Sequence, residues 1–100
     1  MDEFGLNVET IKLINDFFAS VPEVKEVRIF GSRAKGNFKP SSDIDFVLRG
    51  EITPKLLRHI AFELDELSTP YSFDVVDFNG IENADLKKNI QEHSKIFYTR

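Results

Sequence analysis

Apolar residues near the start of the chain recur every three or four positions, a period that is typical of an amphipathic helix. The residues with this spacing are Val8, Ile11, Ile14, Phe18 and Val21. We therefore expect a first helix over about 7–20, which ends before Pro22 because proline disfavours the helical conformation in the residue before it.

Two further helices are expected later in the chain. Thr53 and Pro54 form a favourable start, with threonine as the N-cap and proline at the first helical position. Apolar residues follow at helical spacing up to Leu67, and Pro70 ends this run. Residues 84–94 have the same amphipathic character around Leu86 and Ile90.

Short β-branched and aromatic stretches between these helices read as strands. They cover residues 24–30, 43–48 and 71–78, and a short terminal strand is expected over 96–98. Gly31, Gly36 and Pro40 predict a loop between the first two strands, and Asn79-Gly80 predicts a turn after the third. Because strands and helices interleave, we expect one α/β (α+β) domain over residues 1–100, with helices packed on a small sheet.

Composition narrows the class of protein. The 100 residues include no cysteine, which excludes a disulfide framework, thiolate catalysis and a thiolate metal site. The formal net charge of −4 argues against general attraction to duplex nucleic acid or to anionic lipid. Residues 1–6 carry acids and no long apolar run, and no stretch approaches a membrane span. We therefore expect a cytoplasmic protein without a signal peptide.

Charge is distributed unevenly along the chain. Residues 25–40 hold five bases and one acid, whereas residues 59–86 hold seven acids and neither Lys nor Arg. Such stretches are either two solvated faces or parts of a functional surface.

Asp43 and Asp45 are the first candidate functional residues. Two positions apart on a strand, they point to the same face, about 7 Å apart along the chain. Like charges at this distance repel one another. Ordinary sheets avoid such a pair unless a cation or bases lie between the two charges. Carboxylate oxygens suit a hard ion such as Mg²⁺, which binds through one or two carboxylates together with substrate phosphates.

Gly31 and Ser32 supply the complementary half of a nucleotide site. A glycine directly after a strand lets backbone approach a ligand closely. If residues 32–35 form a helical turn, their free amides and the Ser32 hydroxyl offer hydrogen bonds to an anion. Arg33 either contacts phosphate or pairs with the aspartates. A P-loop is excluded, because Asn37 and Phe38 stand where that motif requires Lys and Ser or Thr.

A third carboxylate should come from the strand over 71–78. Asp74 and Asp77 point to opposite faces of this strand, so only one of them can join the face of Asp43 and Asp45. Burial does not choose between the two residues.

The order of these motifs resembles the DNA polymerase β nucleotidyltransferase superfamily, and at this length the minimal nucleotidyltransferase (MNT) family. The family pattern is hydrophobic-Gly-Ser, about ten residues, Asp-x-Asp, and later a hydrophobic-Asp-hydrophobic segment. Here it reads Phe30-Gly31-Ser32, Asp43-Ile44-Asp45-Phe46 and Phe73-Asp74-Val75. The resemblance implies a palm-like nucleotidyltransferase fold, in which a short mixed sheet carries three carboxylates and helices cover its opposite face.

The resemblance also implies roles for these residues. Asp43, Asp45 and Asp74 would be catalytic and would bind two Mg²⁺ ions, with Asp74 helping to activate the attacking group. Gly31 and Ser32, with Arg33, would hold the nucleoside triphosphate, for which we expect ATP. The reaction would transfer a nucleoside monophosphate to a hydroxyl and release pyrophosphate.

The acceptor implied by the resemblance is a partner protein. Family members of this size occur beside a helical HEPN-type protein, as antitoxin and toxin, and modify or simply bind it. The alternative is therefore a non-catalytic, nucleotide-binding antitoxin that neutralises its partner by covering it. The chain shows no second domain or nucleobase selector, so a protein partner or a homodimer is expected, and transfer to a small molecule such as an aminoglycoside is disfavoured.

Overall fold

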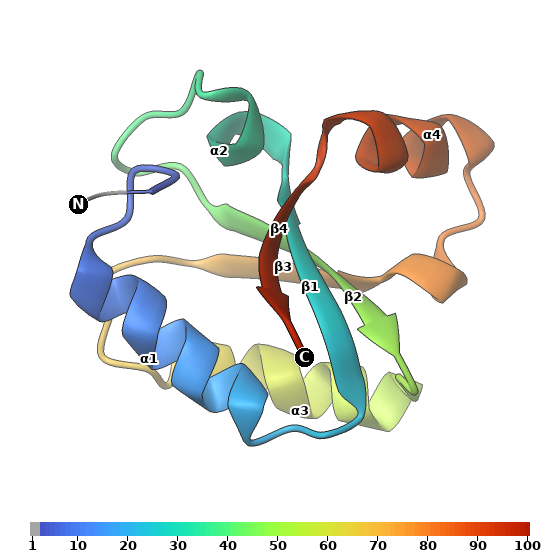
Figure 1. The fold of residues 1–100 in the computed structure, drawn as a ribbon, viewed down its shortest axis with the longest axis horizontal. Helices are drawn as coiled ribbons and strands as arrows, with labels where there is room; N and C mark the ends of the chain where they lie inside the picture. Colours follow the sequence, from blue (N-terminus) through green and yellow to red (C-terminus); the bar gives the residue numbers. More distant parts are fainter. Residues whose placement is uncertain (1–2) are drawn as a thin grey trace.

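Four strands form one mixed sheet in the computed structural model, which describes residues 3–100 (Figure 1). Met1 and Asp2 lie outside the described residues, and so does their part of the expectation about a signal peptide. The sheet order is β3-β2-β1-β4. The strands are β1 (Val24–Phe30), β2 (Ile44–Gly50), β3 (Phe73–Asp77) and β4 (Lys95–Thr99).

The sheet is mixed because its pairs differ in direction. Strand β1 is antiparallel to β2 on one side and to β4 on the other. Strands β2 and β3 are parallel, and helix α3 (Pro54–Asp65) makes the crossover between them. The short terminal strand expected from the sequence is thus confirmed, and it pairs with β1.

The helices begin where the sequence predicts. Helix α1 (Val8–Ala19) is capped by the Asn7 side chain, which accepts a hydrogen bond from the Thr10 amide at 2.8 Å. The Thr53 hydroxyl caps α3 in the same way, with Pro54 in its first turn. Helix α4 (Ala84–His93) is capped by Asn83. The remaining helix, α2 (Gly31–Lys35), is one short turn directly after β1.

The main hydrophobic core lies between the sheet and the pair α1 and α3. Phe46, in the central strand β2, is fully buried there. Its ring lies 5.7 Å from that of Phe18 in α1, 6.0 Å from that of Phe73 in β3 and 4.9 Å from that of Phe97 in β4. One phenylalanine therefore joins three strands and a helix.

Helix α4 packs on the other face of the sheet. Ile90 of α4 forms a second cluster with Val47 and Phe78. Val47 lies two residues after Asp45 in β2 and so points to the same face, which means that α4 covers part of the face that carries Asp45. The expected fold class is confirmed, but its helices are divided between the two faces: Figure 1 shows α1 and α3 together on one side and α4 apart from them.

Within residues 3–100, every helix is too short or too polar to cross a lipid bilayer.

Candidate active site

Two of the predicted carboxylates are neighbours in the sheet. The parallel register of β2 and β3 pairs Asp45 with Asp74, so both side chains leave the same face from adjacent strands. Asp43 directly precedes β2, two residues before Asp45. Asp43 and Asp74 are exposed, whereas Asp45 is half-buried.

The register separates Asp74 from Asp77, which the sequence left open. Asp77 pairs with Leu48, three residues further along β2, and lies on the opposite face from Asp74. Its carboxylate accepts a hydrogen bond from the Asn79 amide at 3.2 Å and so caps the turn after β3. Asp74 therefore belongs beside Asp45 by geometry, and Asp77 stabilises a turn.

Gly31 lies against the Asp45 carboxylate. Strand β1 ends with Phe30 paired to Asp45, and the chain then turns at Gly31 with a φ of 72°. A Cβ at position 31 would overlap the carboxylate oxygen and come within 3.3 Å of its carbon. Only glycine tolerates both this backbone conformation and this close approach.

The helical turn considered for residues 32–35 in the sequence is present as α2. It begins at Gly31, contains the half-buried Ser32, and ends where the Gly36 amide donates to the Ser32 carbonyl at 2.9 Å. The first amides of such a turn have no partner within the helix. Gly31 thus lies at the end of β1 against Asp45, and Ser32 follows it in α2.

Electrostatic repulsion is concentrated on Asp45. Burial is the main cause that raises the pKa of its carboxyl, and the negative charges of Asp74 and Asp43 raise it further. The positive charge of Arg33 acts in the opposite direction. Two neighbouring carboxylates thus disfavour the negative charge on Asp45, and a bound cation would relieve this repulsion.

The donor set fits magnesium in type and number. Within residues 3–100, no three His, Cys, Asp or Glu side chains are gathered closely enough to hold a metal ion alone. Mg²⁺ does not require such a cage, because it retains several waters and takes one or two carboxylates together with substrate phosphates. Asp45 and Asp74, with Asp43 beside them, provide carboxylates of this kind.

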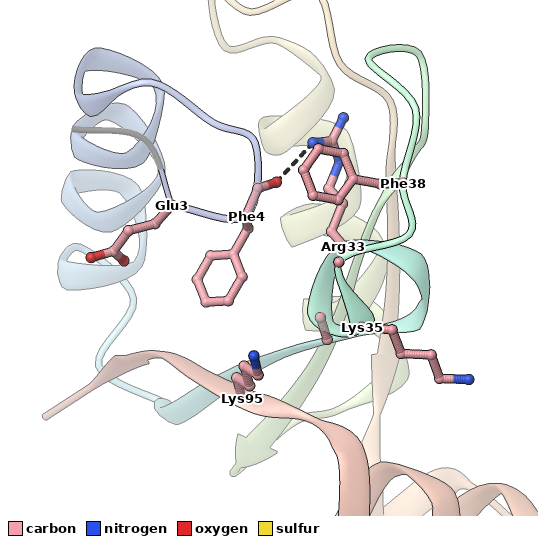
Figure 2. Close-up of a pocket in the computed structure, with 8 residues that line it drawn as sticks. Glu3, Phe4, Arg33, Lys35, Phe38 and Lys95 are labelled. Atoms are coloured by element: carbon pink, nitrogen blue, oxygen red, sulfur yellow. Dashed lines mark hydrogen bonds between the residues drawn. The ribbon is translucent and has the colours of Figure 1, made fainter.

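Arg33 is placed differently from the expectation. Its side chain is 2% exposed, and among the described residues no carboxylate lies within ion-pair distance of it. Figure 2 shows its guanidinium directed at the N-terminal turn, where it donates to the Phe4 carbonyl at 2.9 Å. The other N–H groups donate to Ser42 and Pro40 carbonyls. Among the described residues, the N–H groups of Arg33 therefore bind backbone carbonyls, and Arg33 forms no ion pair with an aspartate.

A cleft of about 330 Å³ lies beside this arginine, between the N-terminal turn and α2 (Figure 2). Its wall includes Phe4, Phe38 and the side chains of Lys35 and Lys95. The sequence did not predict that the N-terminal turn and α2 lie side by side at this cleft. Local sequence patterns do not reveal this contact, because the Phe4 carbonyl that Arg33 binds is 29 residues away in the sequence.

Comparison with known proteins agrees with this geometry. The family described as "Polymerase beta, Nucleotidyltransferase" matches residues 12–100. A toxin–antitoxin structure with AMP-PNP has a TM-score of 0.72 at 20% identity, covering 95% of this chain and 75% of that chain. A MntA-HepT toxin–antitoxin structure gives 0.61 at 19% identity, covering 92% and 68%.

A third solved structure holds a tri-AMPylated HEPN toxin from Shewanella oneidensis in complex with an MNT antitoxin. It has a TM-score of 0.62 at 15% identity and covers 90% of this chain and 73% of that chain. Among curated proteins no match is found. At these identities the solved structures share the fold with this chain.

Proposed function

The chain belongs to the polymerase beta nucleotidyltransferase family, and from this premise we propose that it transfers AMP from ATP to a hydroxyl group of a HEPN-type partner protein. The observation that carries the proposal is the pairing of Asp45 with Asp74 on one face of the sheet, with Gly31 against the Asp45 carboxylate. A carboxylate pair beside a glycine-serine turn suits one task in particular, the binding of a metal-complexed triphosphate.

In the proposed reaction the three aspartates would hold Mg²⁺ and the turn would hold the triphosphate. Bound there, Mg²⁺ would neutralise negative charge on the attacking and leaving oxygens of an in-line displacement. The hydroxyl oxygen of the acceptor bonds to the α-phosphorus, the bond to the bridging oxygen breaks, and pyrophosphate leaves. Asp74, the exposed member of the sheet pair, accepts the hydroxyl proton, and Ser32 hydrogen-bonds the departing phosphates.

A protein acceptor is supported by what the similar structures contain. Their names describe toxin–antitoxin complexes, and one holds an AMPylated HEPN toxin beside an MNT antitoxin. The described residues form one sheet with its helices, and the carboxylate face is open around Asp43 and Asp74, which are exposed. An acceptor hydroxyl carried by a second protein can reach such a face.

Label transfer tests the proposal. The protein, co-purified with its captured partner, is incubated with Mg²⁺ and ATP labelled at the α-phosphate. We expect label on the partner with the natural protein, and none with Asp43→Asn/Asp45→Asn. Asp77→Asn is the matched control, because it changes the same chemical group on the opposite face of β3 and retains an oxygen that can cap Asn79. It should transfer label normally.

Two outcomes would contradict the enzymatic proposal. Equal labelling by the Asp43→Asn/Asp45→Asn protein would remove the aspartates from the chemistry. No labelling by any version, with the same partner captured by all of them, would identify a binding antitoxin that retains the fold of a transferase.

A further inference from the structure

Arg33 is a buried cation that has no ion-pair partner among residues 3–100. Placing a charge in a protein interior is costly unless other groups replace the lost water. Here carbonyl oxygens accept its N–H groups, and the rings of Phe38 and Tyr71 each lie 5.0 Å from the guanidinium carbon. The planar fork of arginine holds five N–H donors in a fixed geometry, whereas lysine has three on a rotating ammonium group, so arginine suits carbonyls from several segments.

The groups that Arg33 contacts come from three separate segments. The Phe4 carbonyl belongs to the N-terminal turn, and the Pro40 and Ser42 carbonyls belong to the loop that enters β2. Tyr71 belongs to the segment that enters β3. The segments that lead to Asp43 and to Asp74 therefore meet at one guanidinium.

Ser42, the residue before Asp43, is fixed through all of its polar groups. Its amide donates to the Lys39 carbonyl at 2.9 Å, and its hydroxyl accepts from the Lys39 amide at 2.9 Å. Its carbonyl accepts from Arg33 Nη2 at 2.8 Å and from Nε at 3.2 Å. Of these three anchors, only Arg33 lies outside the loop itself.

The residue after Asp43 is fixed as well. The Ile44 amide donates to the Ser72 carbonyl at 2.9 Å, which joins the start of β2 to the segment before β3. Asp43 is exposed and lies between two anchored peptide groups. The backbone that carries its carboxylate is thus held on both sides, with Arg33 responsible for the first.

We propose that Arg33 is a positioning residue for the metal carboxylates: it fixes the Ser42 carbonyl, and through it Asp43, against the N-terminal turn. The inference rests on the proposed function for its metal. It assigns the arginine no contact with nucleotide or acceptor. Supporting interactions behind metal ligands typically contribute 10–100-fold in metal affinity, and this is the range expected for Arg33.

Arg33→Met tests the inference, and Arg100→Met is its matched control. Arg100 also binds backbone carbonyls, those of Val24, Phe18 and Val21 at 2.7, 2.8 and 2.6 Å, but at the beginning of β1 rather than its end. Thermal unfolding should show a lower Tm for both variants. The affinity for the Mn²⁺ complex of AMP-PNP, measured by electron paramagnetic resonance, should fall at least about tenfold for Arg33→Met and less than about twofold for Arg100→Met.

Amide hydrogen exchange gives a readout that needs no metal. In Arg33→Met, the amides of residues 39–44 should exchange faster while those of β1 do not change selectively. In Arg100→Met the loop should retain its protection. If the natural protein binds no Mn²⁺ in the presence of AMP-PNP, the proposed function fails, and this comparison still decides whether Arg33 fixes the loop.

A second variant disturbs the arginine without replacing it. Gly5 has a φ of 74°, and a Cβ there would overlap the Phe38 ring and come within 2.9 Å of Arg33 Nη1. Gly5→Ala should therefore lower Mn²⁺ affinity and loosen residues 39–44, even if Arg33→Met does not fold. Natural Mn²⁺ affinity with unchanged loop exchange in a folded Arg33→Met or Gly5→Ala protein would overturn the inference. An equal loss of affinity in Arg100→Met would do the same.

Discussion

Replacing Gly31 with alanine tests whether the turn after β1 is shaped around Asp45. Two costs arise at this position. The φ of 72° is left-handed, which costs an alanine about 1 kcal/mol. The new methyl group would also overlap the Asp45 carboxylate, so this side chain must leave its present rotamer, which costs about 1 kcal/mol more.

Gly36 provides a control in the same helical turn. Its φ is 85°, and a Cβ there would meet nothing within 4 Å. Gly36→Ala therefore carries the first cost and not the second. We expect the free energy of unfolding to fall by about 1 kcal/mol for Gly36→Ala and by about 2 kcal/mol for Gly31→Ala.

The two variants should differ more in activity than in stability. Displacing Asp45 by about 1 Å moves it out of register with Asp74, and misplacement of this size can reduce a rate about 100-fold. Urea denaturation followed by circular dichroism measures the stability difference, and Mg²⁺-dependent label transfer from ATP measures the activity. Equal denaturation midpoints together with equal transfer would refute the reasoning, because the added methyl group would then not reach Asp45.

Two further predictions concern the charge and the core. Asp45→Asn should stabilise the metal-free protein by about 0.5 kcal/mol at neutral pH, because it removes repulsion between neighbouring strands. The folded-state pKa of Asp45 is raised above its ordinary value of 3.8, so the natural protein should lose stability relative to the variant as the pH rises through the folded-state pKa. Tm measured for both proteins between pH 3 and 7 checks this sign. Curves of Tm against pH that run parallel for the two proteins would contradict it. Phe46→Ala should lower the free energy of unfolding by about 3–5 kcal/mol, because it removes a fully buried ring that contacts Phe18, Phe73 and Phe97. A decrease of less than about 1 kcal/mol in urea denaturation would contradict this packing.

Local patterns predicted the elements well because each depends on neighbouring residues. Thr53 and Pro54 begin α3, and β1 spans the β-branched stretch that the sequence indicated. The short strand over 96–98 extends to Lys95–Thr99. What the patterns could not supply is the register between distant segments. Period-two alternation separates Asp74 from Asp77 by face, but only the pairing of β2 with β3 decides which of them meets Asp45.

Arg33 and α4 differed from expectation for the same physical reason. The sequence predicted Arg33 as a phosphate contact or an ion-pair partner, whereas its burial depends on the Phe4 carbonyl and the Tyr71 ring, which lie far from it in the sequence. Likewise, the amphipathic pattern around Ile90 predicts a buried helix face without saying which side of the sheet receives it. In both cases the deciding contacts are far apart in the sequence.

The central position of β1 has a consequence for the order in which the chain folds. Glu26 pairs with Arg49 on one side and with Thr99 on the other, so the second pairing closes a loop about three times longer than the first. The β1–β2 pair can form early, whereas β4 must wait for a costly closure. Until then, β1 presents a row of unpaired N–H and C=O groups that a strand of another molecule can occupy. The rate at which the last strand docks therefore limits how much protein is lost to aggregation during refolding.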